Sequence, residues 1–359
     1  MLQTSKLQTF INAIEPVSAE IRAAAQARID SLVKPPGSLG KLEEIAAQVA
    51  AISGTITPAA RKKCTIVMAA DHGVVEEGIA CAPQEVTAIQ SINMLKNITG
   101  ICVISAANGA DLRVVDIGIK PTLSHPGLIK RKIRPGTANF AKEPAMDRCE
   151  AEQALLIGIE MVKNLVDEGY NLIGTGEMGI GNTSCSSAVY MAFTGADADD
   201  AVGKGGGISD ETLIRKKQII SAALALHQPD PNDPLDVLAK VGGLDVAGMA
   251  GCFLGAAHCK VPIVIDGFIS AAAALIACRL NPLVREYMIP SHLSAEPGYV
   301  HIMRELGLEP MLHLNMRLGE GSGCPLAFGI IDAAIGVLNG MATFDEAMIN
   351  RDYLVDIRT

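Results

Sequence analysis

The middle of the chain contains short apolar runs, separated by segments long enough to form helices. Six such runs follow one another, at residues 64–70, 112–118, 171–174, 261–266, 287–289 and 311–315. Because the runs are apolar on both faces, they suit strands of a parallel sheet that helices cover on both sides. The pattern therefore predicts an α/β fold with a mainly parallel, Rossmann-like sheet.

Both ends of the chain lack a strand pattern and predict helices. Near the N-terminus these are residues 7–14, 19–32 and 42–52, and near the C-terminus 331–339 and 344–349. Chain termini of a domain often lie close together. We therefore expect residues 1–60 and 330–359 to form a small helical domain, beside an α/β domain of residues 61–329 that carries the site.

Composition and charge exclude several classes of protein. Thirty Lys and Arg against 39 Asp and Glu give a net charge of −9, which argues against nucleic acid as a partner. The nine cysteines are scattered without a Cys-x-x-Cys pair, so we expect no disulfide framework and no zinc site. Residues 1–10 have no apolar core, and the most apolar window, 261–278, falls short of a membrane span. The sequence predicts a cytoplasmic protein without a membrane partner.

Two loops share one composition. Residues 176–182 read Gly-Glu-Met-Gly-Ile-Gly-Asn, and residues 319–323 read Gly-Glu-Gly-Ser-Gly, each between a predicted strand and a small-residue helix. Ligands of open parallel sheets bind outside the carboxyl ends of the strands, so Glu177 and Glu320 could face one crevice. A carboxylate there suits proton transfer or support of a developing cation. The alternative is that each glutamate only stabilises a helix N-terminus.

A second interpretation rests on glycine spacing. Gly174-x-Gly176-x-x-Gly179 matches the dinucleotide-binding fingerprint, which would indicate an NAD-dependent oxidoreductase. The fingerprint requires an acidic residue at the end of the next strand, whereas Asp197 lies in a segment that resembles a loop. Glu177 inside the motif would also repel a pyrophosphate, so the match is a weak signal.

Several polar residues end strands or stand alone. Asp71, His72 and Asp266 follow predicted strands, and helix capping or turn formation is the simpler interpretation of each. The remaining histidines lack a metal-ligand spacing such as His-x-x-x-His, so we expect no metal site. Lys204 and Lys216 are candidate cations for an anionic group near the first loop, although such lysines are more often solvated.

Seven motifs occur together in a fixed order. They are residues 34–40 (Lys-Pro-Pro-Gly-Ser-Leu-Gly), 70–74 (Ala-Asp-His-Gly-Val), 83–90 (Pro-Gln-Glu-Val-Thr-Ala-Ile-Gln), 242–245 (Gly-Gly-Leu-Asp), 266–268 (Asp-Gly-Phe), 290–296 (Pro-Ser-His-Leu-Ser-Ala-Glu) and 317–323 (Arg-Leu-Gly-Glu-Gly-Ser-Gly). Over nearly its whole length the chain resembles the nicotinate-nucleotide–dimethylbenzimidazole phosphoribosyltransferases of the cobalamin lower-ligand pathway.

The resemblance implies a reaction. The enzyme would transfer the 5-phosphoribosyl group of nicotinate mononucleotide to 5,6-dimethylbenzimidazole, releasing nicotinate and α-ribazole 5′-phosphate with inversion at C1′. Nicotinate mononucleotide carries no pyrophosphate, so we expect no Mg²⁺ and no other cofactor. The resemblance also implies a homodimer.

The resemblance further implies site residues. Glu320 would be the catalytic base and Glu177 the second active-site acid, which would hold the ribose or shield its cationic character. Lys216, Gly179 and Ser294 would lie on the phosphate side, and Gln90 in the base pocket. Ala82 replaces a serine of well-known members and leaves the preferred base open. The remaining expected substrate contacts are adjacent in the motifs: Met178, Asp266, Gly319 and Gly321.

Overall fold

The computed structural model describes residues 5–59 and 61–357, so parts of the predicted terminal segments (residues 1–4, 60, 358 and 359) lie outside it. Its strands form one six-stranded sheet in the order β3-β2-β1-β4-β5-β6, with every neighbouring pair parallel. The strands are β1 (Lys63–Ala70), β2 (Ala110–Gly118), β3 (Leu128–Lys130), β4 (Leu172–Met178), β5 (Ile263–Ile265) and β6 (Met288–Pro290).

The helices are distributed along the whole chain. They are α1 (Lys6–Asn12), α2 (Ala19–Ser31), α3 (Lys41–Ser53), α4 (Glu85–Leu95), α5 (Gly100–Ala107), α6 (Arg148–Asp167), α7 (Asn182–Thr194), α8 (Ala198–Ala201), α9 (Asp210–His227), α10 (Pro234–Val241), α11 (Leu244–His258), α12 (Phe268–Leu280), α13 (Pro297–Leu306) and α14 (Gly323–Gly340), with 3₁₀ turns η1 (Gly73–Glu77) and η2 (Pro282–Tyr287). The predicted α/β class with a parallel, Rossmann-like sheet is confirmed.

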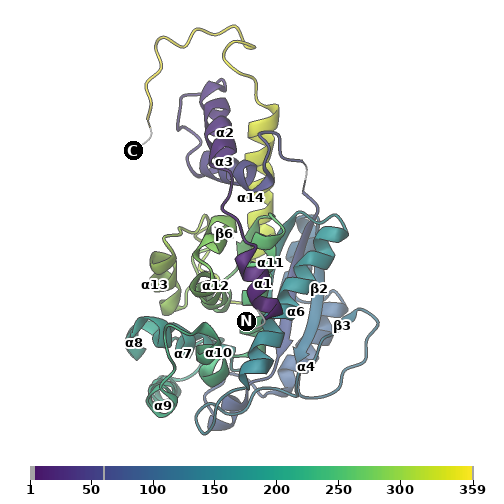
Figure 1. The fold of residues 1–359 in the computed structure, drawn as a ribbon, viewed down its shortest axis with the longest axis vertical. Coiled ribbons are helices and arrows are strands. Elements are labelled where there is room, and N and C mark those ends of the chain that lie inside the picture. The colour runs from purple at the N-terminus through teal and green to yellow at the C-terminus, as the bar shows by residue number, and fades with distance from the viewer. Residues whose placement is uncertain (1–4, 60, 358–359) are drawn as a thin grey trace.

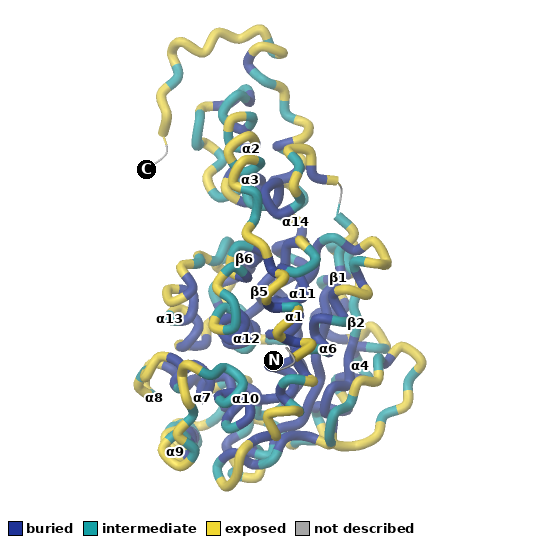
Figure 2. The backbone as a smooth tube through the Cα atoms, viewed as in Figure 1, coloured by how far each residue is buried: buried dark blue, intermediate teal, exposed yellow. Residues whose placement is uncertain are grey.

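Strand β1 shows why the sheet is covered on both faces. Ile66 and Met68 point into a core shared with α6, α11 and α12, whereas Val67 and Ala69 point into a core shared with α4 and α5. Successive side chains of a strand alternate between the two faces, so an apolar run without alternation requires a core on each side. Figure 2 shows the strands as the buried centre of the molecule.

The strand order determines where a ligand can bind. From β1 the chain builds outward to β2 and β3, then returns to place β4 on the other side of β1. The connections leaving β1 and β4 diverge at their carboxyl ends, which opens a crevice at this topological switch point. β1 ends at Ala70, two residues before His72, and β4 ends at Met178, directly before the 179–182 loop.

Helix α14 links this crevice to the terminal helices. It packs against β4 and β5 near its start and against α2 and α3 further along, where these helices project from the sheet (Figure 1). By length and composition α14 could also cross a membrane, but half of it is buried in the structure, as in the core helix of a globular fold. α1 lies instead against α6 and α11, and the division into two domains stays a prediction.

Three local expectations were wrong. Residues 311–315 form only an isolated bridge, between Leu312 and His292. Residues 344–349 form turns instead of a helix, while the backbone of Phe344 bonds to Ser31 at the end of α2. The short edge strand β3 was not expected because it runs into the charged segment 130–134, where Lys132 pairs with Asp116 of β2.

Candidate active site

A cavity of about 270 Å³ opens at the carboxyl ends of β1 and β4. The first turn of α7, the loop before α14 and the N-terminal side of α12 form its walls. Nine of the eleven residues expected at the site line it: Gln90, Glu177, Met178, Gly179, Lys216, Asp266, Ser294, Gly319 and Glu320. The two Gly-Glu loops therefore face one crevice.

Two expected residues do not line the cavity. Ala82 is half-buried outside it, although its neighbour Cys81 is part of the wall. Gly321 lies behind the wall, where its N–H donates to Asp266 Oδ2 at 3.1 Å. Any influence of Ala82 on the bound base would thus be indirect, and Gly321 supports the loop.

The loop that carries Glu320 has an unusual backbone. Gly319, Glu320 and Gly321 all have positive φ, of 80°, 63° and 87°. A non-glycine residue in this region costs about 1–3 kcal/mol, and such strain is concentrated at functional sites. Asp266 stabilises the loop, because its carboxylate also accepts the N–H of Gly323 at 2.7 Å. Burial raises the pKa of Asp266 to about 7.

Both oxygens of the Glu320 carboxylate accept hydrogen bonds. Gln90 Nε2 donates to Oε1 at 2.7 Å, and the backbone N–H of Ile101, in the first turn of α5, donates to Oε2 at 3.1 Å. Both donors are neutral, and together they fix the orientation of the carboxylate. The side chain is 6% exposed and faces the cavity.

Glu177 stands in a different environment at the end of β4. Its Oε2 accepts a hydrogen bond from Asn182 Nδ2, and its Oε1 accepts the backbone N–H of Glu320 at 3.2 Å. Burial, followed by the nearby charge of Asp245, raises the pKa of Glu177 to about 8. This carboxyl group is therefore protonated over much of the neutral range in the free protein.

The two loops are interlocked. A Cβ on Gly176 would collide with the backbone carbonyl of Glu320, and one on Gly319 would collide with the Glu177 carboxylate. Each Gly thus makes room for the other loop's glutamate. These glycines allow close packing, and the two carboxylates are positioned as one unit.

The cavity wall also includes a buried lysine. Lys216 is 2% exposed, and its Nζ donates to Thr183 Oγ1 at 2.8 Å and to the carbonyl of Gly203 at 3.2 Å. Burial lowers the pKa of Lys216 to about 8, so it remains mostly charged at neutral pH. With the N-terminus of α7 beside it, the region around Lys216 suits an anionic group. Lys204, the other candidate, lines the cavity and pairs with Asp210.

The structure does not support the dinucleotide fingerprint. Gly174 and Gly176 lie inside β4, whereas the fingerprint requires its glycines at the turn from strand to helix. A Cβ on Gly174 would meet Cys324 of α14, so this glycine serves helix packing. The oxidoreductase interpretation was therefore wrong.

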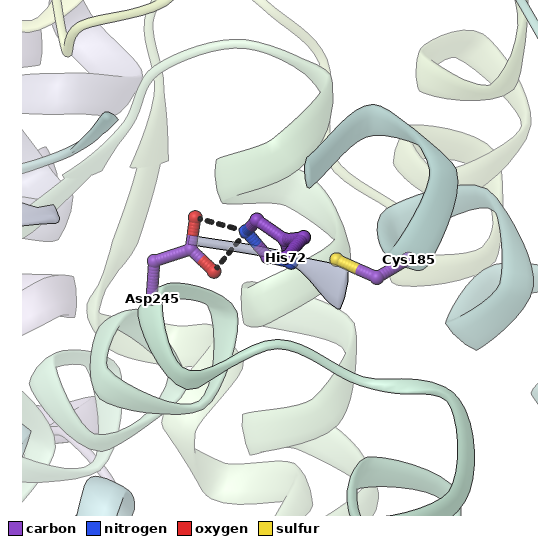
Figure 3. A group of neighbouring side chains, drawn as sticks. All are labelled: His72, Cys185 and Asp245. Atoms are coloured by element: carbon purple, nitrogen blue, oxygen red, sulfur yellow. Dashed lines mark hydrogen bonds and ion pairs between the residues drawn. The ribbon is translucent and has the colours of Figure 1, made fainter. Parts of the chain in front are cut away.

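One cluster of potential metal ligands lies behind the cavity: His72, Cys185 and Asp245. Figure 3 shows the imidazole of His72 lying between the carboxylate of Asp245 and the thiol of Cys185. Nε2 of His72 faces both carboxylate oxygens of Asp245 at 3.2 Å, which is the geometry of an ion pair.

Sequence reasoning missed the roles of Asn182, His72 and Asp245. All three stand in the quoted motifs, but each motif alone allowed capping or turn formation. Only the fold shows that they converge behind Glu177. The available signals were a polar residue shortly after a buried strand, as with His72, and a polar residue at the start of a helix, as with Asn182 and Asp245.

Together, the doubly wound sheet and a cavity lined by two carboxylates and a buried lysine define an α/β enzyme with a small-molecule site. A family model described as phosphoribosyltransferase matches residues 14–349. The nicotinate-nucleotide–dimethylbenzimidazole phosphoribosyltransferase of Clostridium tetani is 50% identical over 353 residues, 98% of each chain. The protein of the same name from Acetivibrio thermocellus is 52% identical over 91% of this chain and 93% of its own.

Solved structures agree. The crystal structure of CobT from Thermus thermophilus superposes with a TM-score of 0.89 and 43% identity, covering 92% of this chain and 99% of that one. The chain therefore belongs to the nicotinate-nucleotide–dimethylbenzimidazole phosphoribosyltransferase family.

Proposed function

We propose that this enzyme transfers the 5-phosphoribosyl group of nicotinate mononucleotide to 5,6-dimethylbenzimidazole, forming α-ribazole 5′-phosphate and nicotinate. The observation that carries the proposal is the interlocked pair Glu177 and Glu320 in a cavity that the buried Lys216 also lines. The names of its relatives supply the two substrates.

Glu320 is the general base of this proposal. One ring nitrogen of dimethylbenzimidazole attacks C1′ of the ribose, and the C1′–N bond to the pyridinium ring breaks with its electron pair passing to nicotinate. The proton of the other ring nitrogen goes to the Glu320 carboxylate. Attack opposite the leaving group inverts the configuration at C1′. A positioned base contributes about 10²–10⁴-fold.

Glu177 faces the sugar in the same proposal. Positive charge develops on the ribose as the pyridinium leaves, and a carboxylate beside it stabilises that charge. The approach of the cationic pyridinium ring of the substrate also favours ionisation of Glu177, whose pKa is about 8 in the free protein. The substrate thus generates the charge that its transition state needs.

The remaining wall residues bind the substrates. Lys216 and the N-terminus of α7 bind the 5′-phosphate, together with Gly179 and Ser294. Gln90 and Met178 border the base, while Asp266 and Gly321 secure the Glu320 loop. The substrate has no pyrophosphate to chelate a divalent ion, so we propose a reaction without Mg²⁺.

We also propose a homodimer in the cytoplasm. Support for the dimer comes from exposed apolar side chains near the Glu320 loop: Ile98, Val103 and Leu318. All nine cysteines are free, as expected in a reducing compartment. Light scattering on the purified protein measures the oligomeric state, and a monomer at micromolar concentration would contradict the dimer.

A metal-free assay tests the function. Purified protein receives nicotinate mononucleotide and 5,6-dimethylbenzimidazole, and chromatography follows both products. We expect nicotinate release that depends on the base and equals the α-ribotide formed. No product with any azole or purine base would overturn the proposal.

A further inference from the structure

Two fully buried charged groups lie directly behind the cavity without lining it. His72, which follows β1, is 1% exposed, and Asp245, in the first turn of α11, is 0% exposed. Nε2 of His72 lies 3.2 Å from both carboxylate oxygens of Asp245, as Figure 3 shows. Burying two ionisable groups is costly, so their retention at this place calls for a reason.

Asn182 connects this pair to Glu177. Its single amide nitrogen donates to the Glu177 carboxylate and, at 3.2 Å, to Asp245 Oδ2. An amide NH₂ has two hydrogens, so both are used by these two carboxylates. The orientation of Glu177 is therefore linked through one residue to Asp245, and through Asp245 to His72.

The pair also supports the loop at the cavity floor. A Cβ on Gly179 would stand 2.7 Å from Asp245 Oδ2 and 2.9 Å from His72 Nε2. The backbone from Gly179 to Asn182 thus rests directly on the two side chains. A change in the pair reaches both Glu177 and the start of α7.

The charges around Glu177 require compensation. Asp245 and Asp266 raise its pKa, and Glu320 faces the same cavity. Among the described residues, the cationic partner of Asp245 is His72, whose other side faces the thiol of Cys185. Burial alone would lower the pKa of His72, but the attraction of Asp245 outweighs it and holds that pKa well above its ordinary value.

We propose that His72 and Asp245 act as one buried ion pair that positions Glu177 through Asn182 and offsets negative charge behind it. Both are positioning residues, because neither touches the cavity. The inference rests on the proposed function, in which ionised Glu177 faces the ribose. Without the imidazolium, Asp245 is left as an unpaired charge next to Glu177 and opposes its ionisation.

The test compares His72→Gln, Asp245→Asn and the double variant. In the single His72 variant, the acidic limb of the kcat/KM profile should move up by about one pH unit, since an unbalanced like charge within about 4–6 Å shifts a carboxyl pKa by that order. Asp245→Asn should not move the limb upward. The double variant has no unpaired charge, so its acidic limb should lie close to the wild-type position.

Two further variants complete this set. Asn182→Ala should lower kcat, because it removes the amide that joins the Glu177 carboxylate to Asp245. His125→Gln, on the loop before β3, is the histidine control and should change neither limb nor kcat. If His72→Gln does not fold, the double variant and Asn182→Ala keep the proposal testable.

A readout without substrate separates this inference from the function. The infrared band of the protonated Glu177 carboxyl, assigned with Glu177→Gln, gives its titration directly. In His72→Gln the band should persist to higher pH than in wild type. The ion-pair role would be overturned if the Glu177 band were unchanged in His72→Gln. It would also be overturned if the loss of kcat/KM in the double variant equalled the combined losses of the two single variants. Absence of transferase activity with a shifted band would overturn the proposed reaction and support the pair.

Discussion

Glu177 and Glu320 lie in loops of the same Gly-Glu composition, yet their surroundings differ in backbone and in charge. Glu177 ends a regular strand and has Asp245 and Asp266 near it, whereas Glu320 has a strained positive φ and neutral donors on both oxygens. Burial and neighbouring acids favour protonated Glu177.

One loop composition therefore serves two purposes. In the proposed reaction the two carboxyl groups have different roles: Glu320 accepts a proton, and Glu177 responds to the positive charge of the pyridinium ring. The two motifs have the same composition, so the difference between Glu177 and Glu320 comes from the regular strand around one and the strained loop around the other.

Loss of the Glu320 carboxylate should have the largest effect. Glu320→Gln keeps the size and can still hydrogen-bond, but it cannot accept the proton, so kcat should fall by about 10²–10⁴-fold. Steady-state assays with both substrates measure the loss, and circular dichroism checks the fold. Glu309→Gln, an exposed glutamate, is the control. A near-normal kcat would remove Glu320 from its assigned role.

Glu177→Gln should lower activity by about 10²-fold and change the pH dependence of stability. The folded-state pKa is about 8 against an ordinary value of 4.5, so wild type loses stability as pH rises between these values. Because Gln does not titrate, the variant does not lose stability over this pH range. Between pH 5 and pH 9, the free energy of unfolding of the variant should therefore rise relative to that of wild type by on the order of 3 kcal/mol.

Urea unfolding at pH 5 and pH 9 measures that gain. Parallel curves for the two proteins would show that Glu177 titrates normally in the folded state. The contrast between its two carboxylates would then rest on backbone geometry alone.

The sequence was sufficient for five of the six strands and for the pairing of the two loops, because both depend on local patterns that parallel strands bring together at one edge. The convergence of His72, Asn182 and Asp245 could not be predicted, since these residues come from separate connections. The positive φ of Glu320 arises from packing against Gly176 and from Asp266. Strand β3 escaped prediction because only three residues pair, at an exposed edge.

Lys216→Met tests the proposed binding of the 5′-phosphate. It removes a buried charge that binds the phosphate, so kcat/KM for nicotinate mononucleotide should fall by roughly 10–100-fold, mainly through KM. Because burial lowers the lysine pKa to about 8, wild-type KM should also rise above that pH. Lys217→Met, which removes a surface pair with Asp199, is the matched control. An unchanged KM would place the phosphate elsewhere.

Gly319→Ala should give the smallest effect, about a tenfold loss in kcat. The added Cβ would meet the Glu177 carboxylate, and the φ of 80° adds about 1–3 kcal/mol of strain. Gly336→Ala is its control, because nothing lies within 4 Å of a Cβ there, inside α14. That change should leave kcat intact and stabilise the helix by roughly 0.5–1 kcal/mol. Equal kcat in the two variants would mean that the carboxylates act without interlocking, and their functional difference would then have to arise from charge alone.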